Sequence, residues 1–145
     1  MKINRIDHIG IVFDDLAAAR AFFLDFGLEV VGEMDLESDL VDRVNALGHV
    51  RTSIVHMRVP GGEAQLELIK YHTPADEHGI QPSFPNRLGI RHILFAVEDI
   101  EAIVAKLKQR GTEFLSEIQN YENIYKLCYC RGPEGIILEL AEKIG

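Results

Sequence analysis

Tryptophan is absent from this 145-residue chain, cysteine occurs only twice, and lysine and arginine together number 15 against 23 aspartates and glutamates. The shortage of positive charge gives a formal net charge of −8. This argues against a nucleic-acid-binding protein, which needs a basic surface to displace phosphate counterions. It argues against binding to an anionic membrane surface for the same electrostatic reason. We therefore expect neither a nucleic acid nor a membrane as a partner.

The sequence also has no apolar run near the roughly 20 residues that a membrane-spanning helix needs. Its first residues, MKINRIDHIG, carry charges where a secretory signal would have its apolar segment. Cys128 and Cys130 are two residues apart within a predicted strand, where their side chains point in parallel and suit a disulfide poorly. These absences predict a cytoplasmic protein with reduced thiols.

The chain contains an internal repeat. When His8 is aligned with His92, an offset of 84 (92 − 8), RIDHIGIVFDDL at 5–16 matches GIRHILFAVEDI at 89–100. The match continues for about twenty residues without a gap, and an ancient duplication is its simplest explanation. The length of the chain predicts one domain that covers residues 1–145.

Both copies show the same order of elements. Each begins with the apolar alternation of a strand and continues with an aspartate, Asp15 or Asp99, where a helix N-cap belongs. A helical spacing of apolar residues follows, and Gly27 or Gly111 stands where a helix ends. A second strand and a hairpin complete each copy, with the turn Pro-Gly-Gly in the first and Gly-Pro-Glu-Gly in the second. Each copy is therefore predicted to be a β-α-β-β-β module.

The two modules differ in length. Aligning Glu67 with Glu139 gives an offset of 72 (139 − 67), so the first module is 12 residues longer (84 − 72). We assign the insertion to DLESDLVDRVNALG at 35–48, whose apolar spacing predicts a short extra helix. The predicted modules are residues 1–72 and 87–145, joined by a connector at 73–86 that contains three prolines.

Four polar side chains point away from the predicted helix-packing faces of the strands. Because side chains alternate between the two faces of a strand, His8 and Glu67 share one face in the first module. His92 and Glu139 do the same in the second module. One such histidine alone is usually structural and one such glutamate usually faces water, but matched positions in a repeat favour a common role. Two imidazoles and two carboxylates are suitable ligands for a first-row divalent cation, with open positions for a substrate.

The chain resembles the vicinal oxygen chelate superfamily, which includes glyoxalase I, methylmalonyl-CoA epimerase, extradiol dioxygenases and the bleomycin- and fosfomycin-resistance proteins. The resemblance covers nearly all of residues 5–142 and is carried by DHIGIVFDDLAAARAFFLDFGLEVV, LELIKYHTP, GIRHILFAVEDIEAIVAKLKQRG and RGPEGIILELAE. It implies an α+β fold in which two tandem βαβββ modules form an eight-stranded open cup around one metal. It implies a divalent ion (Ni, Co, Zn, Mn or Fe), no organic cofactor, and His8, Glu67, His92 and Glu139 as ligands.

The resemblance implies a metal-dependent lyase or isomerase of the glyoxalase I or methylmalonyl-CoA epimerase type. Such an enzyme acts through a metal-stabilised enolate of a small carbonyl substrate, and Glu139 or Glu67 is the expected base. The epimerase has a further acid/base glutamate on its third strand, where this chain offers only His49 or His56. We expect His56, Tyr121 and Tyr125 as substrate contacts.

Three other functions stay open at this point. An extradiol dioxygenase uses Fe(II) on a His-His-Glu set, which here would be His8, His92 and Glu139, although members of that branch are often longer. The fosfomycin-resistance enzymes resemble the same subset. A non-catalytic antibiotic-binding protein is the third alternative, but bleomycin binders have aromatic grooves and no such ligand set. The connector is long enough for the modules to pair within one chain or across two, and members of the superfamily do both. We expect a homodimer.

Overall fold

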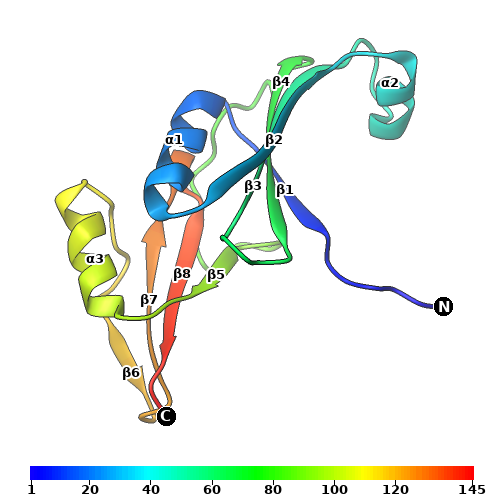
Figure 1. Ribbon diagram of the computed structural model, residues 1–145. Coiled ribbons are helices and arrows are strands. Elements are labelled where there is room, and N and C mark those ends of the chain that lie inside the picture. Colours follow the sequence, from blue (N-terminus) through cyan, green and yellow to red (C-terminus); the bar gives the residue numbers. More distant parts are fainter. The chain divides into compact units, whose positions relative to one another are not determined.

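A computed structural model describes all of residues 1–145 (Figure 1). The chain divides into two compact units, Met1–Ile80 and Gln81–Gly145, which are described separately below. Each unit contains one four-stranded sheet. None of the helices is long and apolar enough to cross a membrane.

The N-terminal unit contains four strands and two helices. In chain order these are β1 (His8–Val12), α1 (Leu16–Phe26), β2 (Glu29–Leu36), α2 (Asp39–Asn45), β3 (Arg51–Arg58) and β4 (Gln65–Thr73). The sheet order is β1-β4-β3-β2, with β1 parallel to β4 and the other neighbours antiparallel. Helix α2 confirms the extra helix that the insertion predicted.

The C-terminal unit repeats this arrangement without the extra helix. Its elements are β5 (His92–Ala96), α3 (Ile100–Gln109), β6 (Gln119–Tyr121), β7 (Tyr125–Arg131), a 3₁₀ turn (Pro133–Gly135) and β8 (Ile137–Lys143). The sheet order is β5-β8-β7-β6, again with a parallel pair, β5 and β8, at one end. The predicted α+β fold of two βαβββ modules is confirmed.

One predicted strand does not form where the sequence pattern places it. The apolar alternation of TEFLSEI at 112–118 predicts a strand, but only Phe114 makes a bridge there, opposite Cys130. The paired residue numbers sum to 244 at this bridge (114 + 130) and to 246 in β6 (119 + 127). The register therefore slips by two residues between the bridge and β6, which interrupts the ladder and confines regular pairing to β6.

Helices α1 and α3, one in each unit, begin and end as their sequences predict. The side chain of Asp15 accepts a hydrogen bond from the N–H of Ala18 at 3.0 Å, and Asp99 accepts one from Ala102 at 3.3 Å. These N-caps satisfy backbone donors that the first turn leaves free. Gly27 follows α1 with φ +117°, a backbone conformation that favours glycine.

The core of each unit lies between its sheet and its helix. The fully buried side chains include Phe13, Phe23 and Leu68 in the first unit, and Ile100, Leu138 and Leu140 in the second. Leu68 and Leu140 are equivalent by the offset of 72 (140 − 68), and neither has any exposed surface. The helix-facing sides of the strands are thus those that the alternation predicted.

Candidate functional site

The first predicted ligand pair is set by the pairing of β1 with β4. Gly10 lies opposite Glu67 in this parallel ladder, and His8 is two residues earlier on the same face of the sheet. The diagonal brings Nε2 of His8 to 3.3 Å from Oε2 of Glu67. The two side chains form what we call the N-terminal His–Glu pair.

The second pair is built by the same register in the other unit. Leu94 lies opposite Glu139 in the β5–β8 ladder, and His92 is again two residues earlier. Nε2 of His92 lies 3.1 Å from Oε2 of Glu139, which defines the C-terminal His–Glu pair. The structure therefore brings the four sequence-predicted ligands together as two matching pairs, one in each unit.

The spacing within each pair suits two ligands of one metal ion. Zinc is bound by histidine nitrogen and carboxylate oxygen at roughly 2.0–2.2 Å, so adjacent ligands lie about 2.8–3.6 Å apart at right-angled or tetrahedral geometry. The two N–O distances of 3.3 and 3.1 Å fall in that range. No group of three or more histidine, cysteine, aspartate or glutamate side chains is arranged to hold a metal ion in the structure. What the candidate site repeats is therefore one His–Glu pair in each unit.

The glutamates are more deeply buried than the histidines. The exposed fraction of the side chain is 19% for Glu67 and 12% for Glu139, against 43% for His8 and 39% for His92. Burying a carboxylate to this extent costs free energy unless a partner compensates its charge. In each pair the imidazole is that partner, and a cation would compensate the charge more completely.

Asp7 orients His8 from the side away from Glu67. The Nδ1–H of His8 donates to Oδ1 of Asp7 at 3.0 Å, which leaves Nε2 directed at Glu67. This hydrogen bond is the main reason that the pKa of His8 is raised and that of Asp7 is lowered. Histidines that bind metals commonly donate their other ring N–H to a carboxylate in this way. Asp7 was not among the residues selected from the sequence, although its place beside His8 was a signal.

The two glutamates have different residues opposite them on the neighbouring strand, a histidine for Glu67 and a tyrosine for Glu139. His56 lies opposite Glu67 in the β3–β4 ladder, and its Nε2 is 2.7 Å from the same Oε2. Its ring centroid lies 5.9 Å from that of His8. The equivalent residue opposite Glu139 is Tyr129, whose ring stands 5.2 Å from His92. The sequence predicted His56 as a substrate contact, and in the structure its polar contact is with a predicted ligand.

A cavity of about 980 Å³ lies on the C-terminal unit beside Glu139. Tyr121 and Tyr125, both predicted as substrate contacts, line this cavity together with Glu139. The rest of its lining is mainly apolar and includes Leu94, Ala96 and Leu127. The structure thus places the two tyrosines and one predicted catalytic glutamate around a common space.

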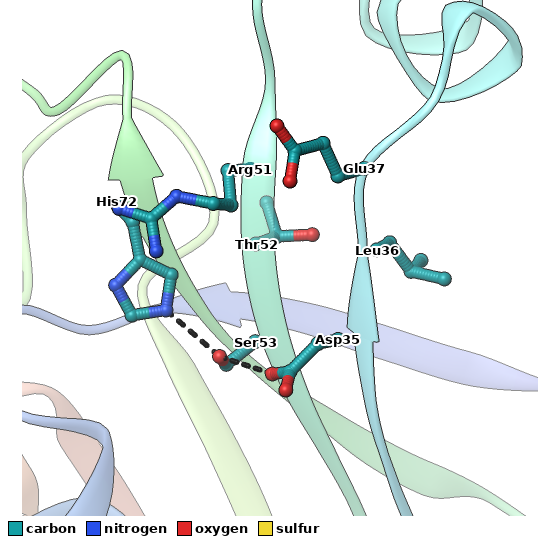
Figure 2. A pocket seen from close by; sticks show the side chains of 7 residues that line it. All are labelled: Asp35, Leu36, Glu37, Arg51, Thr52, Ser53 and His72. Atoms are coloured by element: carbon teal, nitrogen blue, oxygen red, sulfur yellow. Dashed lines mark hydrogen bonds between the residues drawn. The ribbon is translucent and has the colours of Figure 1, made fainter.

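A second cavity, of about 490 Å³, lies in the N-terminal unit (Figure 2). There the hydroxyl of Ser53 donates to Asp35 at 2.5 Å and lies 2.8 Å from Nε2 of His72. A nucleophilic serine needs a histidine base that a carboxylate orients, but here the serine stands between the other two. Ser53 is also three residues from His56 along β3, so it faces the other side of the sheet. This cluster is therefore separate from the N-terminal His–Glu pair.

The fold and the two His–Glu pairs define an α+β protein of duplicated βαβββ modules with a repeated nitrogen-and-oxygen donor set. The chain belongs to the Glyoxalase/Bleomycin resistance protein/Dioxygenase superfamily, whose family model matches residues 5–140.

Among solved structures, a glyoxalase family protein from Bacillus cereus is similar to the whole chain, with 37% identity and a TM-score of 0.94. The similarity covers 100% of this chain and 97% of that one. The uncharacterised protein YaeR of Escherichia coli K12 is 26% identical over 144 residues, 99% of each chain. The uncharacterised protein YwbC of Bacillus subtilis 168 is 28% identical over 141 residues, 97% of this chain and 98% of that protein.

Proposed function

We propose that this protein is a metal-dependent lyase or isomerase that moves a proton at the carbon next to a carbonyl group of a small substrate. The observation that carries the proposal is the repetition of one His–Glu pair, in the same strand register, in both units. Two unrelated structural roles would not require the same two residue types on the same diagonal of both sheets.

The proposed ligands of the divalent metal are His8, Glu67, His92 and Glu139. Their nitrogen and oxygen atoms suit Ni, Co, Zn, Mn or Fe, and no organic cofactor is part of the proposal. When bound, such a cation acts as a Lewis acid that draws electron density from the substrate carbonyl and makes the neighbouring C–H more acidic. Asp7 supports the arrangement, because its hydrogen bond holds the His8 ring with Nε2 toward Glu67.

Glu139 is the proposed base, with Glu67 as the alternative. Oε2 of Glu67 has two imidazole nitrogens within 3.3 Å, from His8 and His56, whereas Glu139 has only that of His92. A carboxylate with fewer fixed contacts can turn toward a substrate at a lower cost. Glu139 also lines the 980 Å³ cavity, so a substrate there would be within reach of its free oxygen.

One observation favours a second candidate function, an Fe(II)-dependent extradiol-type dioxygenase. Oε2 of Glu67 lies nearer to His56, at 2.7 Å, than to His8, at 3.3 Å. If His56 holds Glu67 away from the metal, the ligands that remain are His8, His92 and Glu139. That two-histidine, one-carboxylate set is the one that non-haem iron oxygenases use. A non-catalytic antibiotic-binding protein ranks third, because it would have no need of the paired ligands.

We further propose that the protein acts as a homodimer in the cytoplasm. The support for the compartment is that Cys128 and Cys130 are both free and buried, as in a reducing environment. For the dimer, the connector between the predicted modules is long enough to let them pair across two chains.

The reaction class can be tested by proton exchange. The protein is loaded with Ni, Co, Zn or Mn and incubated in D₂O with 2-oxoaldehyde thiohemiacetals and with acyl-CoA epimers, and deuterium at the carbon next to the carbonyl is followed by NMR. Metal-dependent exchange that Glu139→Gln abolishes is the expected result. Oxygen consumption with a catechol and Fe(II), without any such exchange, would instead establish the dioxygenase.

A further inference from the structure

The cavity of the C-terminal unit is built from three rows of side chains across the sheet. The first row contains Glu139 with Leu94 opposite it on the neighbouring strand. The second row contains Ala96, Ala141 and Leu127, and the third contains Lys143 and the two tyrosines. All three rows share one face because they are two residues apart along each strand. The cavity therefore runs from a carboxylate, across small apolar side chains, to aromatic rings.

The N-terminal unit has larger side chains at the positions of the two alanines. Val12 corresponds to Ala96 (96 − 84), and Ile69 corresponds to Ala141 (141 − 72). Val12 and Ile69 are opposite each other in their ladder, as the two alanines are in theirs. The equivalent sheet of the N-terminal unit thus carries bulky side chains at these two positions. In the C-terminal unit the alanines leave space between Glu139 and the tyrosines.

The sides of the cavity remain open to a ligand. Leu94 is 49% exposed, Tyr121 57% and Tyr125 39%. Exposed apolar and aromatic groups that surround a hollow gain stability when an apolar group covers them. An aryl or branched alkyl group is of suitable chemistry for a floor of alanines and walls of leucine and tyrosine.

The charged groups around the cavity disfavour an anion. Glu98 and Glu139 line it, with Lys143 as the only lysine or arginine in the lining. Glu142 also borders the cavity, but its carboxylate accepts the N–H of Ile100 at the start of α3. A carboxylate or phosphate on the substrate would meet a net negative surface, and no arginine is present to form the paired hydrogen bonds that bind such groups best.

We propose that this cavity receives an uncharged apolar tail of the substrate, aryl or branched alkyl, attached to a carbonyl-bearing head. This inference rests on the proposed function for the head and on the cavity itself for the tail. It also means that the charged part of a glutathione or coenzyme A carrier would lie outside this cavity, because glutathione brings two carboxylates and coenzyme A brings phosphates. Ala96 and Ala141 are then specificity-determining residues.

The test compares two 2-oxo acids with the same head and different tails. Phenylpyruvate has an uncharged aryl tail and 2-oxoglutarate has a carboxylate tail, and both present two neighbouring oxygens to a metal. Binding of each to the metal-loaded full-length protein is measured by isothermal titration calorimetry. We expect phenylpyruvate to bind on the order of tenfold or more tightly than 2-oxoglutarate.

The variant Ala96→Val/Ala141→Ile fills the cavity with the residues that the N-terminal unit carries. It should weaken phenylpyruvate binding by on the order of tenfold while the affinity for 2-oxoglutarate and the metal content stay unchanged. The single variants Ala96→Val and Ala141→Ile are made beside it, so that the comparison stands if the double variant fails to fold. Circular dichroism and thermal unfolding check the fold of each.

The outcomes separate the inference from the function on which it rests. If the wild type binds metal but phenylpyruvate binds no more tightly than 2-oxoglutarate, the apolar-tail inference is wrong and the metal-dependent enzyme stands. If phenylpyruvate binding is unchanged in all three filled variants, the cavity is not where the tail lies, and the inference is wrong. If the wild type takes up no metal, the proposed function fails first, and this is seen in the metal content before any ligand is added.

Discussion

His56 donates a 2.7 Å hydrogen bond to Oε2 of Glu67, and the C-terminal unit has no equivalent of this contact. Tyr129 takes the same cross-strand position opposite Glu139. The two predicted catalytic carboxylates therefore have different surroundings in spite of the repeat. Glu67 is held between two imidazoles, and Glu139 is held by one.

Replacing His56 should affect the metal site more than replacing its counterpart. In His56→Phe, Glu67 loses its shortest hydrogen bond and becomes less ordered, so we expect the metal affinity to fall by roughly tenfold. Tyr129→Phe is the matched control and should leave that affinity unchanged. Dissociation constants are measured by competition with a chromogenic chelator. Equal affinities in both variants and the wild type would show that His56 does not position Glu67.

The two cysteines should be unreactive in the folded protein. Burial raises the pKa of Cys130 from 9.0 to about 12 and also raises that of Cys128, so neither forms the reactive thiolate near neutral pH. We expect no alkylation by iodoacetamide at pH 8 before unfolding, and alkylation of both thiols in denaturant, as read by mass spectrometry. Rapid labelling of the native protein would contradict the burial of this strand.

The same pKa shift sets the direction of a pH effect on stability. A cysteine in the unfolded chain loses its proton near pH 9.0, whereas Cys130 in the folded state keeps it to about pH 12. The folded state then binds more protons, so the free energy of unfolding falls as the pH rises above 9. Cys130→Ala should show a shallower fall than the wild type in denaturant titrations between pH 8 and 10. Identical slopes would argue against the raised pKa.

Equivalent core positions should have similar energetic weight in the two units. Leu68 and Leu140 are fully buried, and truncation of either to alanine leaves a cavity beside a helix. We expect each substitution to lower the free energy of unfolding by about 2–5 kcal/mol in urea titrations. Leu40→Ala in helix α2 is the control, because Leu40 is 61% exposed and should change stability by about 0.5 kcal/mol or less. A large effect at only one of the two core positions would show that the repeat is not energetically equivalent.

Much of the fold could be predicted because its signals are local and occur twice. The alternation of each strand, the caps Asp15 and Asp99 and the glycines after the helices are read from a few neighbouring residues. The faces of His8 and Glu67 follow from the same alternation, and the 3.3 Å contact between them agrees with it. The strand predicted at 112–118 failed because a two-residue slip in register leaves no trace in the apolar pattern.

Two of the contacts that the sequence did not predict depend on register between strands. The pairing of His56 with Glu67 requires knowing which residue of β3 lies opposite which residue of β4. The Asp35–Ser53–His72 cluster joins three strands and needs two such registers at once. Asp7 lies just before β1, where the alternation of the strand no longer predicts the direction of a side chain.

The central claim, a divalent metal held by the two His–Glu pairs, is tested most directly by the metal content of the purified protein. Untagged protein is prepared without chelator, reloaded, dialysed and analysed for Ni, Co, Zn, Mn and Fe per chain, beside His8→Ala, Glu139→Ala and the control His72→Ala. We expect about one ion per chain in the wild type and the control, and a loss of tight binding in the two folded site variants. No bound metal after reloading, or unchanged content in His8→Ala and Glu139→Ala, would contradict the proposed site.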